Sequence, residues 1–144
     1  MRKTVRELGI ALWTLALLGC VTIGGKNILV DFRSGEGIQK GDRVYLSGIL
    51  VGTVSGQPQL HNNRARVPVT LYRDHKDAVP EGTVFLLRDD PVQAGRSRLD
   101  AYTAAAGSRP AAEHGVFSGA RNRAEMILLL GEEGAARAWE KVNQ

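Results

Sequence analysis

Short segments in which apolar and polar residues alternate, separated by glycine-rich turns, constrain the fold of this chain most. Residues 28–32 read ILVDF and place every second side chain on one apolar face, as a half-buried β-strand does. Residues 44–46 and 49–51 flank Ser47-Gly48, which predicts a two-residue hairpin turn. Strands this short, repeated at close spacing, indicate a small closed β-barrel or a β-sandwich.

Further segments up to residue 102 are predicted to form strands. Residues 64–72 alternate again, and Asn62-Asn63 before them tolerates positive φ, which predicts another hairpin. Pro68 lacks an N–H, so its strand should lie at a sheet edge or contain a local irregularity. Two further strands are predicted at residues 83–87 and 99–102, and the small, polar residues 103–119 are predicted to form a loop.

An uncharged segment of 18 residues, Leu8–Gly25, precedes the first predicted strand. As a helix rising about 1.5 Å per residue it would extend roughly 27 Å, enough to cross a thin bilayer core. Basic residues at positions 2, 3 and 6 precede it, so the positive-inside rule keeps the N-terminus in the cytoplasm and exports the rest. Residues 1–25 are therefore predicted to be a cytoplasmic N-terminus and a single-pass anchor in the inner membrane.

Two other interpretations of this segment stay open. It can be a cleaved signal peptide, or Leu17–Cys20 can be a lipobox that leaves a lipid on Cys20 after cleavage. Apolar residues continue past the cysteine through Val21 and Ile23, which favours the uncleaved helix. All three interpretations place the folded domain on the far side of the inner membrane.

Charge and composition argue against several classes of function. After the residues that precede Leu8 are set aside, 16 Lys/Arg and 14 Asp/Glu remain, a mixed surface that does not favour nucleic-acid binding. Cys20 is the single cysteine, and the three histidines lie far apart without metal-ligand spacing. Asp89 and Asp90 are adjacent in a predicted loop, where Asp is usually a turn former. We therefore expect no enzyme, no cofactor and no metal site.

Residues 120–144 change character and predict a C-terminal amphipathic α-helix. Asn122 can cap this helix, and Glu125, three residues on, completes a capping box. Gly131 weakens the middle of the segment. The apolar face can pack on the chain's own barrel or against copies of itself, and the sequence favours neither. That face includes Ile127, Leu128 and Leu130.

The stretch Phe32–Val54 resembles the opening of an MCE (mammalian cell entry) domain of the MlaD-like type. There, a strand leads to a G-(I/L)-x-x-G-x-x-V turn and then to x-G-(I/V)-x-V-G-x-V; residues 37–44 and 47–54 fit both patterns. Segments 66–71, 79–83, 95–102 and 115–119 resemble later parts of the family pattern. The glycines of the first stretch are expected to permit turns or close strand approach. These fold glycines are Gly41, Gly48 and Gly52.

The resemblance implies an all-β fold, a small seven-stranded MCE β-barrel over residues 26–119. One transmembrane helix would precede it, and the C-terminal α-helix of residues 120–144 would follow. The resemblance also implies a homohexameric ring in the periplasm, with a central pore that conducts phospholipids or other hydrophobic molecules. The chain would then be the substrate-binding or pore subunit of an ABC-type transport system, with permease and ATPase subunits as partners.

By position, the family's pore-lining loop falls on the seven residues Asp89, Asp90, Pro91, Val92, Gln93, Ala94 and Gly95. The family's paired leucines are missing there, and only Val92 and Ala94 are apolar. Two acidic residues per subunit would form an acidic ring, so the apolar lining is expected from the C-terminal helix instead. The residues expected to supply it are Ile127, Leu128 and Leu130.

Two other functions stay open on the sequence. The chain can be a membrane-anchored β-barrel adaptor or scaffold with no lipid path, or, less favoured, an exported hydrolase that uses Asp89 and Asp90. The residues do not specify the lipid, the direction of transport, or whether a ring would be homomeric or mixed.

Overall fold

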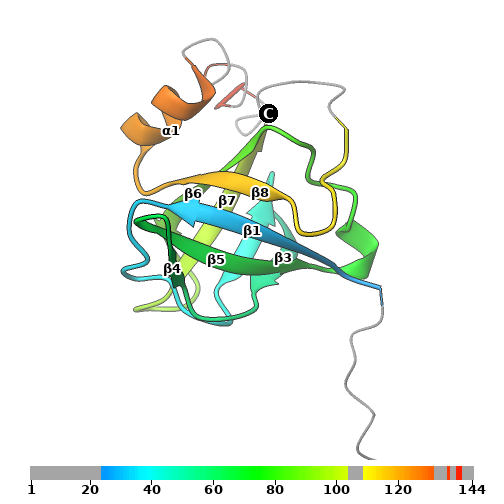
Figure 1. Cartoon of the computed structure of the whole chain (residues 1–144), viewed down its shortest axis with the longest axis horizontal. Coiled ribbons are helices and arrows are strands. Elements are labelled where there is room, and N and C mark those ends of the chain that lie inside the picture. The colour runs from blue at the N-terminus through cyan, green and yellow to red at the C-terminus, as the bar shows by residue number, and fades with distance from the viewer. Residues whose placement is uncertain (1–23, 104–108, 132–135, 137–138, 141–144) are drawn as a thin grey trace, which may run out of the picture.

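The computed structural model describes residues 24–103 and 109–131 together with Ala136, Trp139 and Glu140, and it consists mostly of β-strands (Figure 1). The expected anchor, including Cys20, lies outside the described residues. None of the helices in the described ranges has the length and apolar character that crossing a membrane requires. The elements are β1 (Lys26–Phe32), β2 (Arg43–Leu46), β3 (Ile49–Val54), β4 (Gln59–His61), β5 (Arg64–Leu71), a 3-10 helix (Arg73–His75), β6 (Thr83–Asp89), β7 (Ser97–Thr103), β8 (Val116–Ala120) and α1 (Arg123–Leu130).

Seven of the strands form a closed barrel. Their order is β1-β8-β6-β7-β2-β3-β5, and β5 pairs back with β1 to complete the ring. The short strand β4 pairs with β5 outside the ring. The pairs β1–β8, β6–β8 and β2–β7 are parallel, and the other pairs are antiparallel. The seven-stranded barrel expected from the resemblance is therefore confirmed.

The interior of the barrel is a packed core. Alternate residues of the strands point inward, and Val30, Phe32 and Phe85 are fully buried. A ring of about eight strands is just wide enough for side chains to fill. A single barrel of this kind therefore has a solid centre and not a channel.

Both predicted hairpin turns are present. Ser47 and Gly48 have φ values of 50° and 79°, and they connect β2 to β3. Asn62 and Asn63 have φ values of 49° and 60°, and they connect β4 to β5. Both turns therefore use the left-handed backbone conformation that glycine and asparagine adopt most readily.

Gly52 allows β3 and β5 to approach closely, as expected. A Cβ atom at this position would lie 2.4 Å from the carbonyl oxygen of Thr70 on β5. The β2–β3 register also shifts between Val44 and Tyr45, which marks a bulge beside Gly52.

The predicted irregularity at Pro68 is confirmed. Its strand, β5, lies between β1 and β3, and the carbonyl oxygen of Pro68 accepts a hydrogen bond from Ser55, just after β3 ends. Pairing with β4 resumes only at Arg66. The nitrogen of Pro68 therefore faces the gap between the end of β3 and the start of β4, where no hydrogen bond between strands is needed.

The prediction of a loop over residues 103–119 is wrong at its C-terminal end. Residues 116–120 form β8, which lies parallel to both β1 and β6 (Figure 1). Phe117 and Ala120 are buried, and Gly119 leaves room for the ring of Phe32, which a Cβ would approach to 2.5 Å. Its two partner strands, β1 and β6, are distant in sequence, so no local sequence pattern predicts the pairing.

Helix α1 begins at a cap that closely resembles the predicted capping box. The Asn122 side chain accepts the N–H of Glu125 at 2.8 Å. The Glu125 carboxylate accepts the N–H of Arg121 at 3.0 Å, one residue before the cap. The helix ends at Leu130, and Gly131 follows with a φ of 75°, at the weak point seen in the sequence.

The outer face of the barrel carries a second apolar cluster beneath α1. Met126, which is 1% exposed, is the helix residue at its centre. Leu130 and Trp139 pack against it, and the Trp139 ring stacks on Tyr102 with centroids 6.2 Å apart. The start of the C-terminal segment therefore packs on its own barrel. The buried residues of the cluster are Val84, Leu86, Tyr102, Ala120 and Met126.

Candidate functional site

The loop between β6 and β7, expected to face a pore, is a tight turn organised by Asp90. The Asp90 carboxylate accepts the backbone N–H groups of Val92 and Gln93 at 2.9 and 3.3 Å. The N–H of Asp90 also donates to the carbonyl oxygen of Arg96 at 2.9 Å. Gly95, with a φ of 75°, completes the turn. Asp90 is therefore the turn former that its neighbours Pro91 and Gly95 indicate.

This geometry corrects the expectation of two acidic side chains facing outward from the loop. Asp90 is only 6% exposed and its carboxylate bonds inside the turn, whereas Asp89 is exposed at the end of β6. At the tip of the loop Val92 is 74% exposed, and Pro91 and Ala94 are exposed beside it. The loop therefore presents a small apolar tip, because the carboxylate of Asp90 is hydrogen-bonded inside the turn.

Arg96 fastens this loop to the turn before β2. Its guanidinium donates to the Gln39 side chain and to the Lys40 carbonyl oxygen, both at 3.0 Å. It also forms an ion pair with Asp42 at 3.1 Å. Neither Arg96 nor Asp42 was predicted from the sequence as a site residue. The signal available in the sequence was the position of Asp42 directly after Gly41 of the family pattern. In the structure, a Cβ atom at Gly41 would lie 3.2 Å from the Arg96 guanidinium.

Asp42 is an acid buried at the base of the loop. Its side chain is 1% exposed and accepts the N–H of Gln39 at 2.8 Å. Burial raises the pKa of Asp42 above its ordinary value, and this effect outweighs the opposing hydrogen bond from Gln39 and the charge of Arg96. The Arg96 pair therefore holds a carboxylate that is costly to leave without a partner.

The helix residues expected to face lipid or other subunits do not share one environment. Leu128 is 83% exposed and Leu129 is 41% exposed, whereas Leu130 packs against the cluster around Met126. Ile127 is half-buried between them. One helix therefore binds the barrel with one side and offers two leucines on the other.

An open hollow of about 720 Å³ lies between the base of the loop and the start of α1. Asp89 and Ser97 line it from the β6–β7 hairpin, Arg121 from the segment before α1, and Glu36 from the turn after β1. The hollow is polar at its rim, so it does not itself supply an apolar surface. Within the described ranges, no group of three or more His, Cys, Asp or Glu side chains is placed to hold a metal ion.

A closed seven-stranded barrel with one tightly held, apolar-tipped loop defines a small all-β domain. The family model described as MlaD protein matches residues 24–102, which include the whole loop. The chain belongs to this family, and the resemblance drawn from the sequence is confirmed.

Among the solved structures that match, one shares the fold over most of both chains. It is a chain of the Acinetobacter MlaFEDB complex in its ATP-bound Vtrans1 conformation, with a TM-score of 0.53 and 16% sequence identity. The similarity covers 85% of this chain and 92% of the Acinetobacter chain. No match was found among curated proteins.

Proposed function

We propose that this chain is a membrane-anchored subunit of an ABC-type lipid-transport system and is not an enzyme. The observation that carries the proposal is the family match over residues 24–102, because it includes the loop whose tip exposes Val92. The Acinetobacter chain with the same fold belongs to a complex captured with ATP bound, which supports a permease and an ATPase as partners here. The uncharged segment Leu8–Gly25 would anchor the chain in the inner membrane, with the barrel in the periplasm.

The packed interior of the barrel bears on where a lipid would travel. Phe32, Phe85 and Leu71 fill the centre and are all fully buried, so acyl chains have no room there. A lipid path therefore requires a space between barrels, which a homohexameric ring with a central pore would provide. In such a ring Val92 would face the pore, and Leu128 would face lipid or a neighbouring copy.

The alternative is a membrane-anchored adaptor or scaffold without a lipid path. The observation in its favour is the small size of the apolar tip, in which Val92 is the one large apolar side chain among the loop residues. In this version the exposed leucines of α1 would bind another protein instead of lipid.

Native mass spectrometry of the full-length protein in mild detergent tests the proposal. We expect a six-subunit assembly that carries phospholipid. A lipid-free monomer would contradict the homomeric ring and leave a mixed ring or the adaptor. A hexamer without lipid would favour the scaffold.

A further inference from the structure

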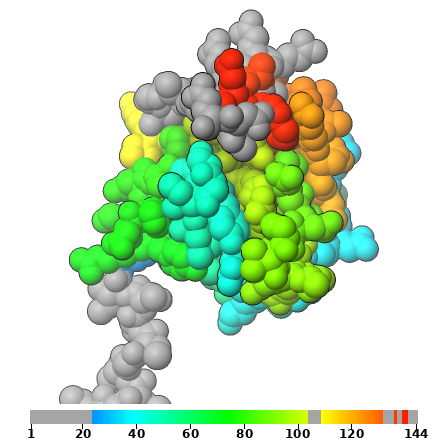
Figure 2. All heavy atoms as spheres, turned by 180° about the vertical axis from the view of Figure 1, so that it is seen from behind, coloured from blue at the N-terminus to red at the C-terminus, as the bar shows by residue number. Residues whose placement is uncertain are grey.

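Three arginines lie in register across neighbouring strands on the outer face of the barrel. Arg43 of β2 is opposite Arg98 of β7, and Arg98 is opposite Arg88 of β6. All three point outward, because the residues next to them in each strand, Val44, Leu87 and Leu99, pack toward the core. Figure 2 shows this face, with the cyan residues of β2–β3 beside the yellow-green residues of β6–β7.

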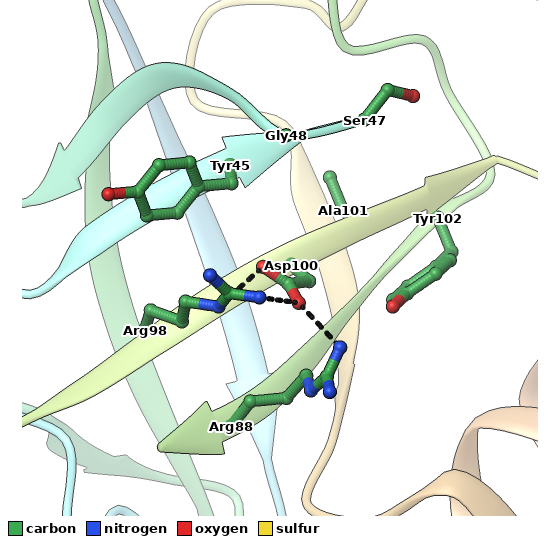
Figure 3. A pocket seen from close by; sticks show the side chains of 8 residues that line it. All are labelled: Tyr45, Ser47, Gly48, Arg88, Arg98, Asp100, Ala101 and Tyr102. Atoms are coloured by element: carbon green, nitrogen blue, oxygen red, sulfur yellow. Dashed lines mark hydrogen bonds and ion pairs between the residues drawn. The ribbon is translucent and has the colours of Figure 1, made fainter. Parts of the chain in front are cut away.

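Like charges directly opposite one another destabilise a sheet, so this row needs compensation. Asp100 supplies part of it, because its Oδ2 accepts hydrogen bonds at 3.3 Å from both Arg88 and Arg98 (Figure 3). The Nε of Arg98 also lies 3.2 Å from Oδ1 of the same carboxylate. The single carboxylate of Asp100 therefore pairs with two guanidinium groups, those of Arg88 and Arg98, and a net positive charge remains.

The rest of the row has weaker compensation. The guanidinium of Arg98 lies over the Tyr45 ring at 5.2 Å from its centroid. The pKa of Arg43 is raised chiefly by a hydrogen bond to the Tyr45 side chain, and the charge of Asp90 contributes less. A tyrosine stabilises a cation without neutralising it. The outer face formed by β2, β6 and β7 therefore keeps a net positive charge.

A pocket of about 180 Å³ opens directly beside two of these arginines, Arg88 and Arg98. Asp100 lines the same side between them, the Ser47-Gly48 turn lines another side, and the Tyr45 and Tyr102 rings form walls (Figure 3). Pockets for drug-sized ligands occupy about 300–1,000 Å³, so this one suits a small group. Its lining offers guanidinium and hydroxyl donors, and planar guanidinium groups match phosphate oxygens in paired hydrogen bonds.

We propose that this arginine pocket, formed by Arg88, Arg98, Tyr45 and the Ser47-Gly48 turn, binds a phosphate group. The phosphate can belong to a phospholipid headgroup, whose acyl chains would stay outside the pocket, or can be inorganic phosphate. The inference stands on the charge row and the pocket, and only the lipid source rests on the proposed function. A concave pocket of this size favours a phosphate over the side chains of an acidic protein partner, which would need a broader contact.

Phosphorus-31 NMR of the full-length protein in mild detergent tests the proposal with two ligands. Binding of inorganic phosphate tests whether the pocket holds a phosphate group. Binding of dihexanoyl phosphatidic acid tests whether that phosphate can belong to a lipid. Arg88→Gln is the main variant because the Arg88 side chain is 46% exposed, so its loss should spare the fold. Arg109→Gln is the matched control, since Arg109 is exposed and does not line the pocket.

We expect wild type and Arg109→Gln to broaden the phosphate line equally, and Arg88→Gln to bind at least about tenfold more weakly. Asp100→Asn should bind more tightly, because it frees guanidinium donors. Loss of phosphatidic acid binding in Arg88→Gln supports the site with a lipid source, and a difference with inorganic phosphate alone supports it with a free source. Equal binding of both ligands by wild type and Arg88→Gln overturns the proposal. A change in oligomer mass without any change in phosphate binding overturns it in favour of a protein interface.

Discussion

Arg66 on β5 donates hydrogen bonds from Nε and Nη2 to the two carboxylate oxygens of Asp31 on β1, at 2.9 and 3.0 Å. The two residues are directly opposite each other in the β1–β5 pairing that closes the barrel. Paired hydrogen bonds between arginine and carboxylate are among the stronger polar contacts in proteins. This contact therefore holds the first strand to the middle of the chain at the point of closure.

Asp31→Asn should lower the melting temperature by a few degrees near neutral pH. The hydrogen bond from Arg66 holds the pKa of Asp31 below its ordinary 3.8. Since the folded-state pKa is depressed, the stabilisation is complete above that ordinary value and is lost as the pH falls through the folded-state pKa. The difference in melting temperature between wild type and variant should therefore stay the same between about pH 7 and pH 5 and shrink as the pH falls below 3.8. Asp74→Asn, at an exposed site, is the control, and a difference that does not depend on pH would contradict this account.

Gly119→Ala should destabilise the barrel by about 1–3 kcal/mol, the usual cost of overpacking a core. The added Cβ would lie 2.5 Å from the ring of Phe32, which is fully buried in the core. Urea denaturation of the variant measures the loss. Ser118→Ala, on the exposed side of the same strand, should unfold at the wild-type urea concentration. Equal stability of Gly119→Ala and wild type would show that Phe32 can repack.

Arg96→Gln should destabilise the base of the β6–β7 loop by roughly 1–3 kcal/mol, because it leaves Asp42 buried with one partner fewer. Hydrogen exchange of residues 90–96 should speed up in the variant. The pKa of Asp42 is already raised by burial, so protonation at mildly acidic pH should recover part of the loss. Adding Asp42→Asn to Arg96→Gln should also recover it, since no buried charge remains. Failure of the double variant to recover would mean that the Gln39 and Lys40 contacts of Arg96 matter more.

Met126→Ala should release α1 from the barrel, because Met126 is the helix residue at the centre of the outer cluster. The expected loss is about 2–4 kcal/mol for the docking of the helix, with the barrel still folded. Hydrogen exchange of residues 123–130 compared with that of β6 separates the two effects. Leu128→Ala, at a position that is 83% exposed, is the matched control and should leave exchange unchanged. Equal protection of α1 in both variants would contradict the assigned anchor.

A photo-crosslinking amino acid at position 92 should form adducts with phospholipid in the native membrane. The proposed pore places this exposed loop tip beside the lipid path. The control position is Val116, which is 54% exposed and lies beside the start of β6, at the opposite end of that strand from the loop. Mass spectrometry of the crosslinked products identifies the adducts at both positions. Adducts at residue 116 and none at residue 92 would move the lipid path away from the loop.

Most of the barrel strands were predictable because each carries its own signal. Alternation marked β1 and β5, and positive-φ pairs marked both hairpin turns at residues 47–48 and 62–63. The irregularity at Pro68 followed from its missing N–H. These features are local, so neighbouring residues are sufficient to specify them.

The features that sequence reasoning missed are contacts between distant segments. β8 pairs with β1 and β6, whose partner residues are 87 and 34 positions earlier, and its sequence resembles the loop around it. Arg96 reaches a turn more than 50 residues earlier, and the arginine row joins three strands. Which partner each of these residues meets depends on barrel closure.

The sequence by itself determined the family, the strand-forming segments, the turn positions and the helix cap, because side-chain alternation, backbone φ preference and capping act over a few residues. The tertiary structure alone decided that Asp90 turns inward, that Asp42 pairs with Arg96, and that Arg43, Arg88 and Arg98 converge on one face. Charge, burial and pocket shape are properties of neighbours in space, and those neighbours exist only after β5 has paired with β1.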